Sequence, residues 1–322
     1  MKIAVVIPLW NGEKVIGKTL ASLKKQTLKV DKIIIVDNAS TDNSVEFIRK
    51  NFPEVIILKN KINKGPAGGY ADGMRYAYKK GYDFIWLLDQ DSNPTPQTLE
   101  IQLKCFNMLL KKYKKPSIVA PLPITKDGRV YTIRAKCLYK SLPFEAYITD
   151  LSGMLIHRDI VNIVGFPLEI LFTDAVDWEY SIRVRYNGFK IFINPKASMY
   201  HRRGTPVKIR LPIKNKIYKV RKRDGIVATY TNTWLIGRYP PFRYYNMGRS
   251  ETLLLWHPFF NLTDKLFILK QLLRKLIKIQ LFENEKSRKT ISLLKGIIAG
   301  IKVKHKFLKL VKSSVLKSRR KN

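Results

Sequence analysis

Two aspartates one residue apart, Asp89 and Asp91, are the first residues of this 322-residue sequence whose type and spacing could do chemistry. They directly follow the apolar run 84–88, so both carboxylates belong to a turn at the end of an expected buried strand. Hard divalent cations such as Mg²⁺ prefer carboxylate oxygens and can share them with substrate phosphates. Such a cation would offset the negative charge that grows on a diphosphate leaving group. Alternatively, the two acids and Ser92 only form a polar turn before Pro94; we favour the metal site.

A second polar cluster begins at Asp37, immediately after the apolar run 33–36. The Asp37 carboxylate could accept a hydrogen bond from a nucleobase N–H or a ribose hydroxyl. Ser40 or Asp42 suits the N-cap of a helix that we expect over 44–50. We therefore assign ligand contact to Asp37 and helix capping to one of the later residues.

The elements that must position these residues alternate along the first third of the chain. Short runs rich in Val and Ile predict strands over 3–7, 32–36, 55–58 and 84–88, with helical patterns between them. Such alternation predicts βαβ units and a mainly parallel sheet, whose ligands bind beyond the carboxyl ends of the strands. The loop after the third strand carries Gly65, Gly68 and Gly69. These glycines either allow close backbone approach or serve only as turn residues.

Four motifs, in this order, resemble the family 2 glycosyltransferases, and most of all their rhamnosyltransferase and galactofuranosyltransferase-like branch. The motifs are Val5-Val6-Ile7-Pro8-Leu9-Trp10-Asn11, Ile35-Val36-Asp37-Asn38-Ala39-Ser40-Thr41-Asp42, Asn63-Lys64-Gly65 and Asp89-Gln90-Asp91. The resemblance covers roughly residues 1–205 and implies an α/β GT-A fold, a Rossmann-like nucleotide-binding fold with a mainly parallel sheet. It also implies an inverting transfer of a sugar from a nucleotide diphosphate, a UDP- or dTDP-sugar of the rhamnose or galactose type.

The resemblance assigns roles to individual residues on the donor side. Asp37 binds the base or ribose, Asp89 lies by the ribose, and Asp91 holds a divalent metal, Mg²⁺ or Mn²⁺. The donor-binding residues are Pro8, Asn11, Asp37, Asn38, Asn63, Gly65, Asp89 and Gln90. Related enzymes have a histidine that looks like a further metal ligand at the position of His201, and imidazole can join carboxylate and phosphate oxygens. An isolated histidine is more often structural, so both interpretations of His201 stay open.

A second acidic cluster lies within residues 171–183, which are typical of a helix start; we expect the helix to end near Asn187-Gly188. An inverting transferase needs a carboxylate to remove the proton of the acceptor hydroxyl. The resemblance implies that Asp177 is this base. Alternatively, Asp177 only interacts favourably with the helix dipole.

The resemblance also places the acceptor site. The turn at 150–153 is similar to the family's acceptor-side loop, which makes Ser152 and Gly153 acceptor-binding residues, and Trp178 and Glu179 would assist. Alternatively, Glu179 pairs with Arg183 at the i+4 position of the same helix. The later segment 244–250 matches the family's aromatic and Arg-Asn element only in part, which leaves the donor sugar open.

The net charge of +37 is concentrated in the C-terminal part of the chain. Residues 201–322 hold 31 Lys and Arg against 5 Asp and Glu, a net charge of +26. Apolar residues recur there at helical spacing: Leu262, Leu266, Leu269, Leu273, Leu276 and Ile277, then Leu294, Ile298, Ile301, Leu308, Val311 and Val315. Basic amphipathic helices of this kind can lie on an anionic membrane surface. The alternative is packing against the catalytic domain with a solvated outer face; we favour the membrane.

These patterns set the expected organisation. We expect a GT-A catalytic domain over 1–210, with a nucleotide-sugar part over 1–115 and an acceptor and catalytic part over 116–210. A basic helical region over 211–322 would follow it. The chain carries two cysteines, which favours a reducing compartment, and no signal peptide or membrane-spanning run is expected. The expected location is the cytoplasm, peripherally on the cytoplasmic face of the cell membrane, where the acceptor would be a glycan or lipid-linked glycan.

Two other classes of protein remain as alternatives. A nucleic-acid-binding protein is supported by charge alone, without any recognition motif, and acidic clusters lie where a polyanion would have to dock. A nucleotidyltransferase would usually carry a Gly-rich basic loop near the first strand, and Asn11-Gly12-Glu13 does not supply one. The sequence has neither a P-loop nor a GxGxxG motif, which argues against triphosphatases and dinucleotide-dependent enzymes.

Overall fold

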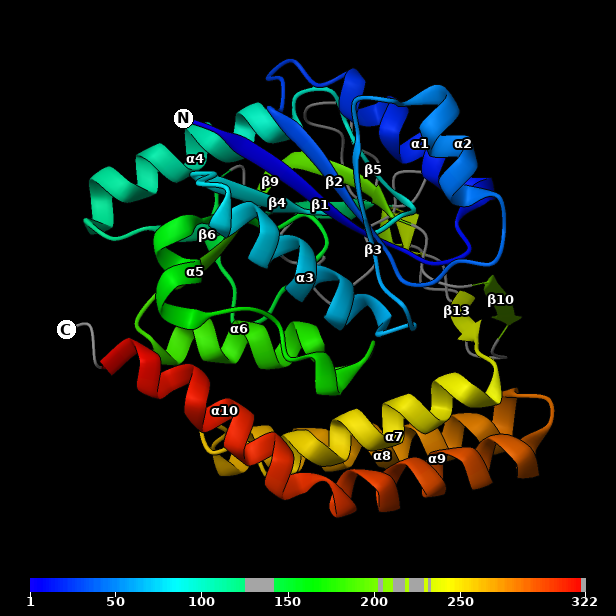
Figure 1. Cartoon of the computed structure of the whole chain (residues 1–322). Helices are drawn as coiled ribbons and strands as arrows, with labels where there is room; N and C mark the ends of the chain where they lie inside the picture. Colours follow the sequence, from blue (N-terminus) through cyan, green and yellow to red (C-terminus); the bar gives the residue numbers. More distant parts are fainter. Residues whose placement is uncertain (125–141, 202–204, 211–217, 220–228, 231–232, 320–322) are drawn as a thin grey trace.

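The computed structural model describes residues 1–124, 142–201, 205–210, 218–219, 229–230 and 233–319. Within them, a nine-stranded sheet with strand order β3-β2-β1-β4-β8-β6-β9-β5 forms the centre, and β7 pairs with β9. Helices cover both faces of this sheet, and a bundle of further helices lies beneath it (Figure 1). The fold is α/β, as the sequence predicts.

The first half of the sheet is parallel. Its strands are β1 (Ile3–Leu9), β2 (Lys32–Asp37), β3 (Ile56–Lys59) and β4 (Phe84–Leu87). Alternate residues of β1 enter opposite cores: Ala4 and Val6 face one, and Val5 and Ile7 face the other. Burial on both faces explains why these strands are continuous apolar runs in the sequence.

The second half of the sheet is mixed. Its strands are β5 (Ser92–Pro94), β6 (Ser117–Ile124), β7 (Phe144–Glu145), β8 (Leu155–His157) and β9 (Lys190–His201). Strand β8 runs antiparallel to both β4 and β6, whereas β6 and β9 are parallel. The short strand β5 pairs antiparallel with the end of β9 and sets Ser92 opposite His201.

Two sets of helices complete the two cores. Helices α1 (Glu13–Lys24), α2 (Ser44–Asn51) and α4 (Thr98–Tyr113) bury residues in one core, and α3 (Gly65–Lys79), α5 (Arg158–Val164) and α6 (Val176–Tyr186) in the other. Helix α3 packs very close to β1, because a Cβ atom added at Gly73 would lie 2.3 Å from Cγ1 of Val6. This close packing fixes the N-terminal end of α3 beside the strand ends.

The C-terminal helices pack on the central sheet and its helices and share one of its cores. They are α7 (Pro241–Leu255), α8 (Leu262–Phe282), α9 (Lys286–Lys302) and α10 (Lys304–Arg319). Tyr244, Leu253, Ile268 and Phe307 are buried in the same core as α3, α5 and α6. Before α7, β10 (Thr205–Arg210) pairs with β13 (Thr233–Arg238), and β11 (Tyr218–Lys219) with β12 (Thr229–Tyr230). Packing of α7–α10 on the catalytic part, one of the two alternatives for these helices, is therefore present.

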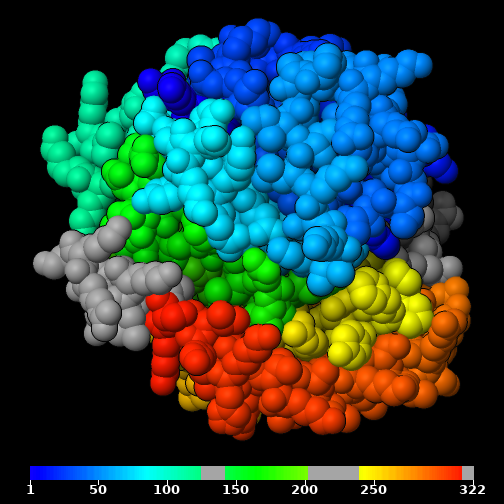
Figure 2. Space-filling model, viewed as in Figure 1, coloured from blue at the N-terminus to red at the C-terminus, as the bar shows by residue number. Residues whose placement is uncertain are grey.

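The outer faces of the bundle expose apolar side chains among charged ones, and α9 and α10 form the lower surface in Figure 2. Helix α8 buries Ile268, Leu272 and Ile279 but exposes a second apolar stripe. The exposed residues are Leu262, Leu266, Leu269, Leu273, Ile277 and Leu281 on α8, and Ile291, Leu294, Ile298 and Ile301 on α9. No helix in the described part of the chain combines the length and the apolar character needed to cross a bilayer.

Candidate active site

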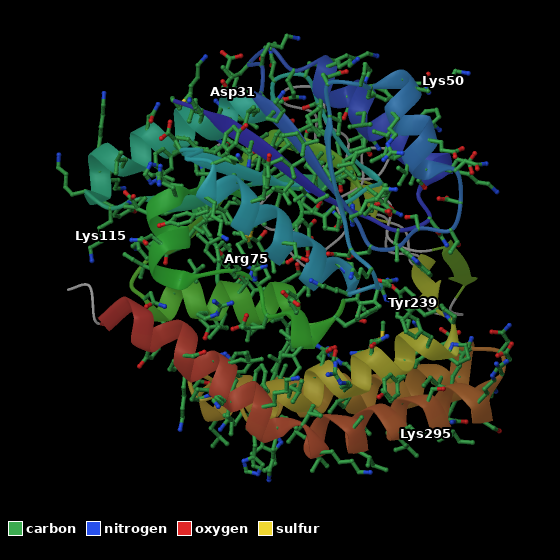
Figure 3. All side chains as sticks on the ribbon, viewed as in Figure 1. Asp31, Lys50, Arg75, Lys115, Tyr239 and Lys295 are labelled. Atoms are coloured by element: carbon green, nitrogen blue, oxygen red, sulfur yellow. The ribbon has the colours of Figure 1, made fainter. Side chains whose placement is uncertain are left out.

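A cleft of about 530 Å³ opens at the carboxyl ends of β1, β2 and β4, where ligands bind in sheets of this kind. The predicted site residues that line it are Pro8, Asn38, Asn63, Gly65, Asp89, Gln90, Asp91, Ser152, Asp177 and His201. Tyr239, which also lines the cleft, lies between the N-terminal end of α3 and the start of α7 (Figure 3). Asn11, Asp37, Gly153, Trp178 and Glu179 do not line it.

Asp89, Asp91 and His201 come together in this cleft, and one ligand atom from each lies within 4.8 Å of the others. Nε2 of His201 is 3.8 Å from Oδ2 of Asp89, and Nδ1 is 3.8 Å from Oδ1 of Asp91. Oγ of Ser92 lies 2.9 Å from Nδ1 of His201, because β5 pairs with β9 at this point. A tautomer that carries its proton on Nδ1 would donate to Ser92 and leave the Nε2 lone pair for a metal.

Asp89 is held by two hydrogen bonds. Its Oδ1 accepts one from the hydroxyl of Tyr70 at 2.7 Å, and its backbone N–H donates to Oγ of Ser152 at 2.8 Å. Burial and the charge of Asp89 raise the pKa of Tyr70 well above its usual value, so the hydroxyl stays protonated and keeps donating. Ser152, predicted as an acceptor residue, therefore also positions a carboxylate of the candidate metal site.

Asp177 lines the cleft from the first turn of α6. Its Oδ1 accepts a hydrogen bond of 2.7 Å from the backbone N–H of Leu151. A negative charge in the first turn of a helix is favoured by the helix dipole. The structure thus places an oriented carboxylate in the same cleft as the Asp89, Asp91 and His201 cluster.

The loop before α6 has an uncommon backbone. Phe172 has φ 60° and ψ −74°, and Thr173 N–H bonds to the Leu171 carbonyl at 2.8 Å, which makes a strained γ-turn. The Phe172 carbonyl accepts from Ala67 N–H at 2.9 Å, and a Cβ at Gly65 would lie only 2.4 Å from that carbonyl oxygen. Gly65 also has φ +68°. The absence of a side chain at Gly65 therefore allows the loop after β3 to approach the loop that leads into α6 and Asp177.

Asn11 and Asp37 do not line the cleft and instead hold the backbone of the adjacent loops. Oδ1 of Asn11 accepts a hydrogen bond of 2.8 Å from Thr41 N–H, and Oδ1 of Asp37 accepts one of 3.0 Å from Ser40 N–H. The Asn11 bond joins the loop after β1 to the loop after β2, and the Asp37 bond holds the loop after β2 to the end of its own strand. The structure thus gives both residues a part in shaping the loops, rather than a place on the cleft surface.

Glu179 has no access to an acceptor in this structure. Its side chain is fully buried, and both carboxylate oxygens accept hydrogen bonds from Arg183, at 2.7 and 2.8 Å. Burial alone would raise the pKa of Glu179, but the charge of Arg183 lowers it to about 2. The i,i+4 pair, which was the alternative interpretation of Glu179, accounts for this geometry.

Gly153 and Trp178 also lie away from the cleft surface. Gly153 has φ +95°, and a Cβ there would lie 2.6 Å from Pro121, so this residue allows the turn before β8 to pack closely on β6. The Trp178 ring packs against Phe267 of α8, with ring centroids 5.2 Å apart. Trp178 therefore joins α6 to the C-terminal bundle, and no acceptor contact follows from its position.

Sequence reasoning missed the part of the site that comes from beyond residue 210. Tyr239, Phe242 and Arg243 line the cleft, and the rings of Phe172 and Phe242 meet edge to face with centroids 5.7 Å apart. The expected catalytic domain over 1–210 thus holds only part of the cleft. The one available signal was the nearby aromatic segment 244–250, whose match to the family is partial.

The comparisons with known proteins agree with this geometry. Residues 4–129 match the family model described as glycosyl transferase family 2. The dTDP-rhamnosyl transferase RfbF of Shigella flexneri is 28% identical over 68% of this chain and 77% of its own length. Galactofuranosyltransferase GlfT1 of Mycolicibacterium smegmatis is 25% identical over 63% of this chain and 72% of its own length.

Solved structures show the same fold. The crystal structure of S. aureus TarS 1-349 in complex with UDP has a TM-score of 0.54 and 15% identity, covering 100% of this chain and 92% of that one. The crystal structure of GalNAc-T7 with UDP, GalNAc and Mn²⁺ has a TM-score of 0.50 and covers 62% of this chain and 44% of that one. Family match, relatives and fold agree: residues 4–129 match the family 2 glycosyltransferases, and the chain is a glycosyltransferase with the GT-A fold.

Proposed function

We propose that this glycosyltransferase inverts the anomeric configuration while it transfers a sugar from a nucleotide diphosphate to a glycan or lipid-linked glycan. One observation carries the proposal: the cluster of Asp89, Asp91 and His201 and the carboxylate of Asp177 line one cleft. A site of this kind can hold a diphosphate at one group and deprotonate an acceptor at the other. The proposed reaction needs both groups close together, because the diphosphate and the acceptor hydroxyl react at the same anomeric carbon.

The donor would be a UDP- or dTDP-sugar of the rhamnose or galactose type. Support comes from the names of the two relatives, which refer to dTDP-rhamnosyl and galactofuranosyl transfer. Among the predicted donor residues, those that line the cleft are Pro8, Asn38, Asn63, Gly65, Asp89 and Gln90, and we assign the nucleotide to them. Asn11 and Asp37 would act through the loops after β1 and β2, whose backbone they hold.

The residues present fit a divalent metal. Two carboxylates and one imidazole offer ligand atoms within 4.8 Å of one another, a donor set that suits Mg²⁺ or Mn²⁺. We assign Asp89, Asp91 and His201 as the ligands, and Tyr70 and Ser92 as the residues that orient them. When bound, the ion would supply positive charge for the diphosphate.

Asp177 would be the general base. As the acceptor oxygen forms its bond to the anomeric carbon, the hydroxyl proton would move to the Asp177 carboxylate. The bond between the anomeric carbon and the diphosphate oxygen would break on the opposite side, and its electron pair would stay with the diphosphate. Attack from the side opposite the leaving group inverts the configuration. Leu151 N–H would keep Oδ1 of Asp177 in place during this step.

We place the reaction at an anionic membrane surface on the cytoplasmic side. The exposed apolar residues of α8 and α9 lie beside exposed cations, among them Lys270, Arg274, Lys295 and Lys302. Apolar burial and attraction to anionic head groups would then act together. A lipid-linked acceptor would be present at the same surface.

A donor screen tests the proposal. The intact chain is incubated with Mn²⁺ and a panel of UDP- and dTDP-sugars, and saturable binding and release of the nucleoside diphosphate are measured. One donor class should bind saturably, and its turnover should stop when a chelator removes the metal. The proposal fails if no nucleotide sugar binds in the presence of Mn²⁺.

A further inference from the structure

Arg243 contributes a positive charge to the cleft. Of the described residues that line the cleft, it is the only lysine or arginine. Four carboxylates line the same space: Asp89, Asp91, Asp150 and Asp177. A cleft with this balance repels anions unless cations offset the carboxylates.

The Arg243 side chain is oriented before any ligand arrives. Its guanidinium lies over the Tyr239 ring, 4.9 Å from the centroid, and Nη2 is 3.3 Å from Oδ1 of Asp174. Burial would lower the pKa of Arg243, but Asp174, Tyr239 and the more remote Asp89 raise it, so the charge is permanent. The side chain is nevertheless 43% exposed, so part of the guanidinium faces the cleft.

The hydrogen bonding around this pair is incomplete. In the described part of the chain, Nε of Arg243 and Oδ2 of Asp174 are among the few buried polar side-chain atoms without a hydrogen-bond partner. Buried polar atoms in folded proteins usually have one, and exceptions often mark functional positions. An ion pair that only stabilises the fold would not require a guanidinium at the surface of a cleft that also carries four carboxylates.

We infer that Arg243 binds the sugar-bearing phosphate of the donor diphosphate and stabilises it as the leaving group, with Asp174 as its positioning residue. The inference rests on the proposed function. Arg243 lines the same cleft as the cluster of Asp89, Asp91 and His201, to which the diphosphate is assigned, and its charge interacts with that of Asp89. Negative charge grows on the phosphate oxygen as the glycosidic bond breaks. Arg243 would donate hydrogen bonds to it and transfer no proton, because its guanidinium stays protonated.

The inference assigns a catalytic residue to the C-terminal region. Helix α7, which carries Arg243, packs between the catalytic part and α9. The C-terminal bundle would therefore complete the active site in addition to any contact with a membrane. A phosphate on the acceptor would have the same chemistry, and the experiment separates the two sources.

The test compares nucleotides that differ by one phosphate. Arg243→Gln and Arg243→Lys are titrated by calorimetry with UDP and UMP, and with dTDP and dTMP, in Mn²⁺. Arg288→Gln is the matched control, because it removes an arginine of the same region whose side chain is 75% exposed outside the cleft. We expect the affinity of Arg243→Gln for the diphosphate to fall about tenfold or more, as for loss of a charge-assisted hydrogen bond. Its affinity for the monophosphate should not change.

The turnover rate supplies a second readout. Because the charge on the phosphate grows in the transition state, kcat of Arg243→Gln should fall in addition to donor affinity, and Arg243→Lys should recover part of both. If Arg243→Gln unfolds, Arg243→Lys replaces it in the test and should show a smaller loss of affinity, for the diphosphate alone.

Unchanged diphosphate affinity with a raised KM for the acceptor would assign Arg243 to the acceptor and overturn the inference. Equal losses for both nucleotides, together with a lowered melting temperature, would show only a structural pair. Either outcome leaves donor turnover by the wild type intact, whereas a wild type that turned over no donor would overturn the proposed function itself.

Discussion

Among the cleft residues, Asp91 is the best single position at which to test the metal. Asp89 would be a poorer choice, because its carboxylate also accepts a hydrogen bond from the buried Tyr70 hydroxyl. Asp91→Asn should raise the Mn²⁺ concentration that gives half-maximal activity. Loss of a residue that only contacts a metal ligand weakens metal binding roughly 10- to 100-fold, and loss of a ligand should weaken it at least as much. The melting temperature of Asp91→Asn should equal that of the wild type. The control is Asp159→Asn, which changes an exposed acid on α5 and should alter neither the melting temperature nor the Mn²⁺ requirement. Full activity of Asp91→Asn in chelator would contradict the metal role.

Asp177 gives the second test on a single residue. Asp177→Asn retains the size of the side chain and an oxygen for the Leu151 N–H, but its amide cannot accept the acceptor proton. The turnover rate should fall by roughly two to four orders of magnitude, the usual range for general base catalysis. Calorimetry with the donor should give the wild-type affinity, because the base acts on the acceptor. A variant with a normal turnover rate and lost donor affinity would show that Asp177 is not the base.

Within α6, the pair of Glu179 and Arg183 makes a prediction at the scale of an element. Glu179→Ala would leave a fully buried guanidinium without its counter-charge, which destabilises a fold by about 3–5 kcal/mol. Thermal unfolding should therefore shift strongly downward, while the acceptor KM of the enzyme that remains folded should not change. In contrast, Glu100→Ala, which breaks the exposed i,i+4 pair with Lys104, should hardly affect unfolding. A Glu179→Ala variant with normal unfolding and a raised acceptor KM would restore the acceptor-binding interpretation.

The elements themselves show where sequence reasoning works. The strands predicted over 3–7, 32–36 and 84–88 begin at the same residues as β1, β2 and β4. Their ends differ from the observed ends by at most two residues. Their apolar runs are buried on both faces, so local composition was enough. Strand β5 has only three residues, Ser92–Pro94, and nothing in its composition predicts that it pairs with β9. That pairing brings His201 to Asp91, so only the family resemblance could suggest the histidine as a ligand.

At the scale of the whole molecule, the distinction between a catalytic domain and a C-terminal tail is weaker than the charge suggests. Helical periodicity in α8 identified an apolar stripe, but all of its residues except the partly buried Leu276 are exposed, and a different face enters the core through Ile268, Leu272 and Ile279. Periodicity cannot tell which of two apolar faces a neighbouring element will cover. For the same reason, no local pattern could show that Arg243 completes a cleft made by the first 201 residues.

The membrane hypothesis makes a prediction for the molecule as a whole. Removing the C-terminal helices would open a shared core, so point variants on the exposed stripe are the better test. Leu266 and Leu273 are 56% and 57% exposed, and replacing both with Glu should leave the fold intact. Flotation of the intact chain with liposomes should rise with anionic lipid content, at about 1 kcal/mol per basic residue near the surface. The double variant should lose most of this binding, because it removes apolar burial and adds repulsion.

A control variant and a comparison with nucleic acid binding decide how the flotation result is interpreted. Met108→Glu adds a charge at an exposed apolar position of α4 and should float like the wild type. Salt weakens both membrane and nucleic acid binding, since both depend on charges screened over a Debye length. Lipid composition separates them, because neutral liposomes remove the attraction of the head groups and leave the apolar term. An intact chain that ignored anionic liposomes but bound RNA tightly would assign the basic surface of α8 and α9 to a polyanion instead. Soluble-acceptor activity of the double variant should persist, because neither leucine lines the cleft.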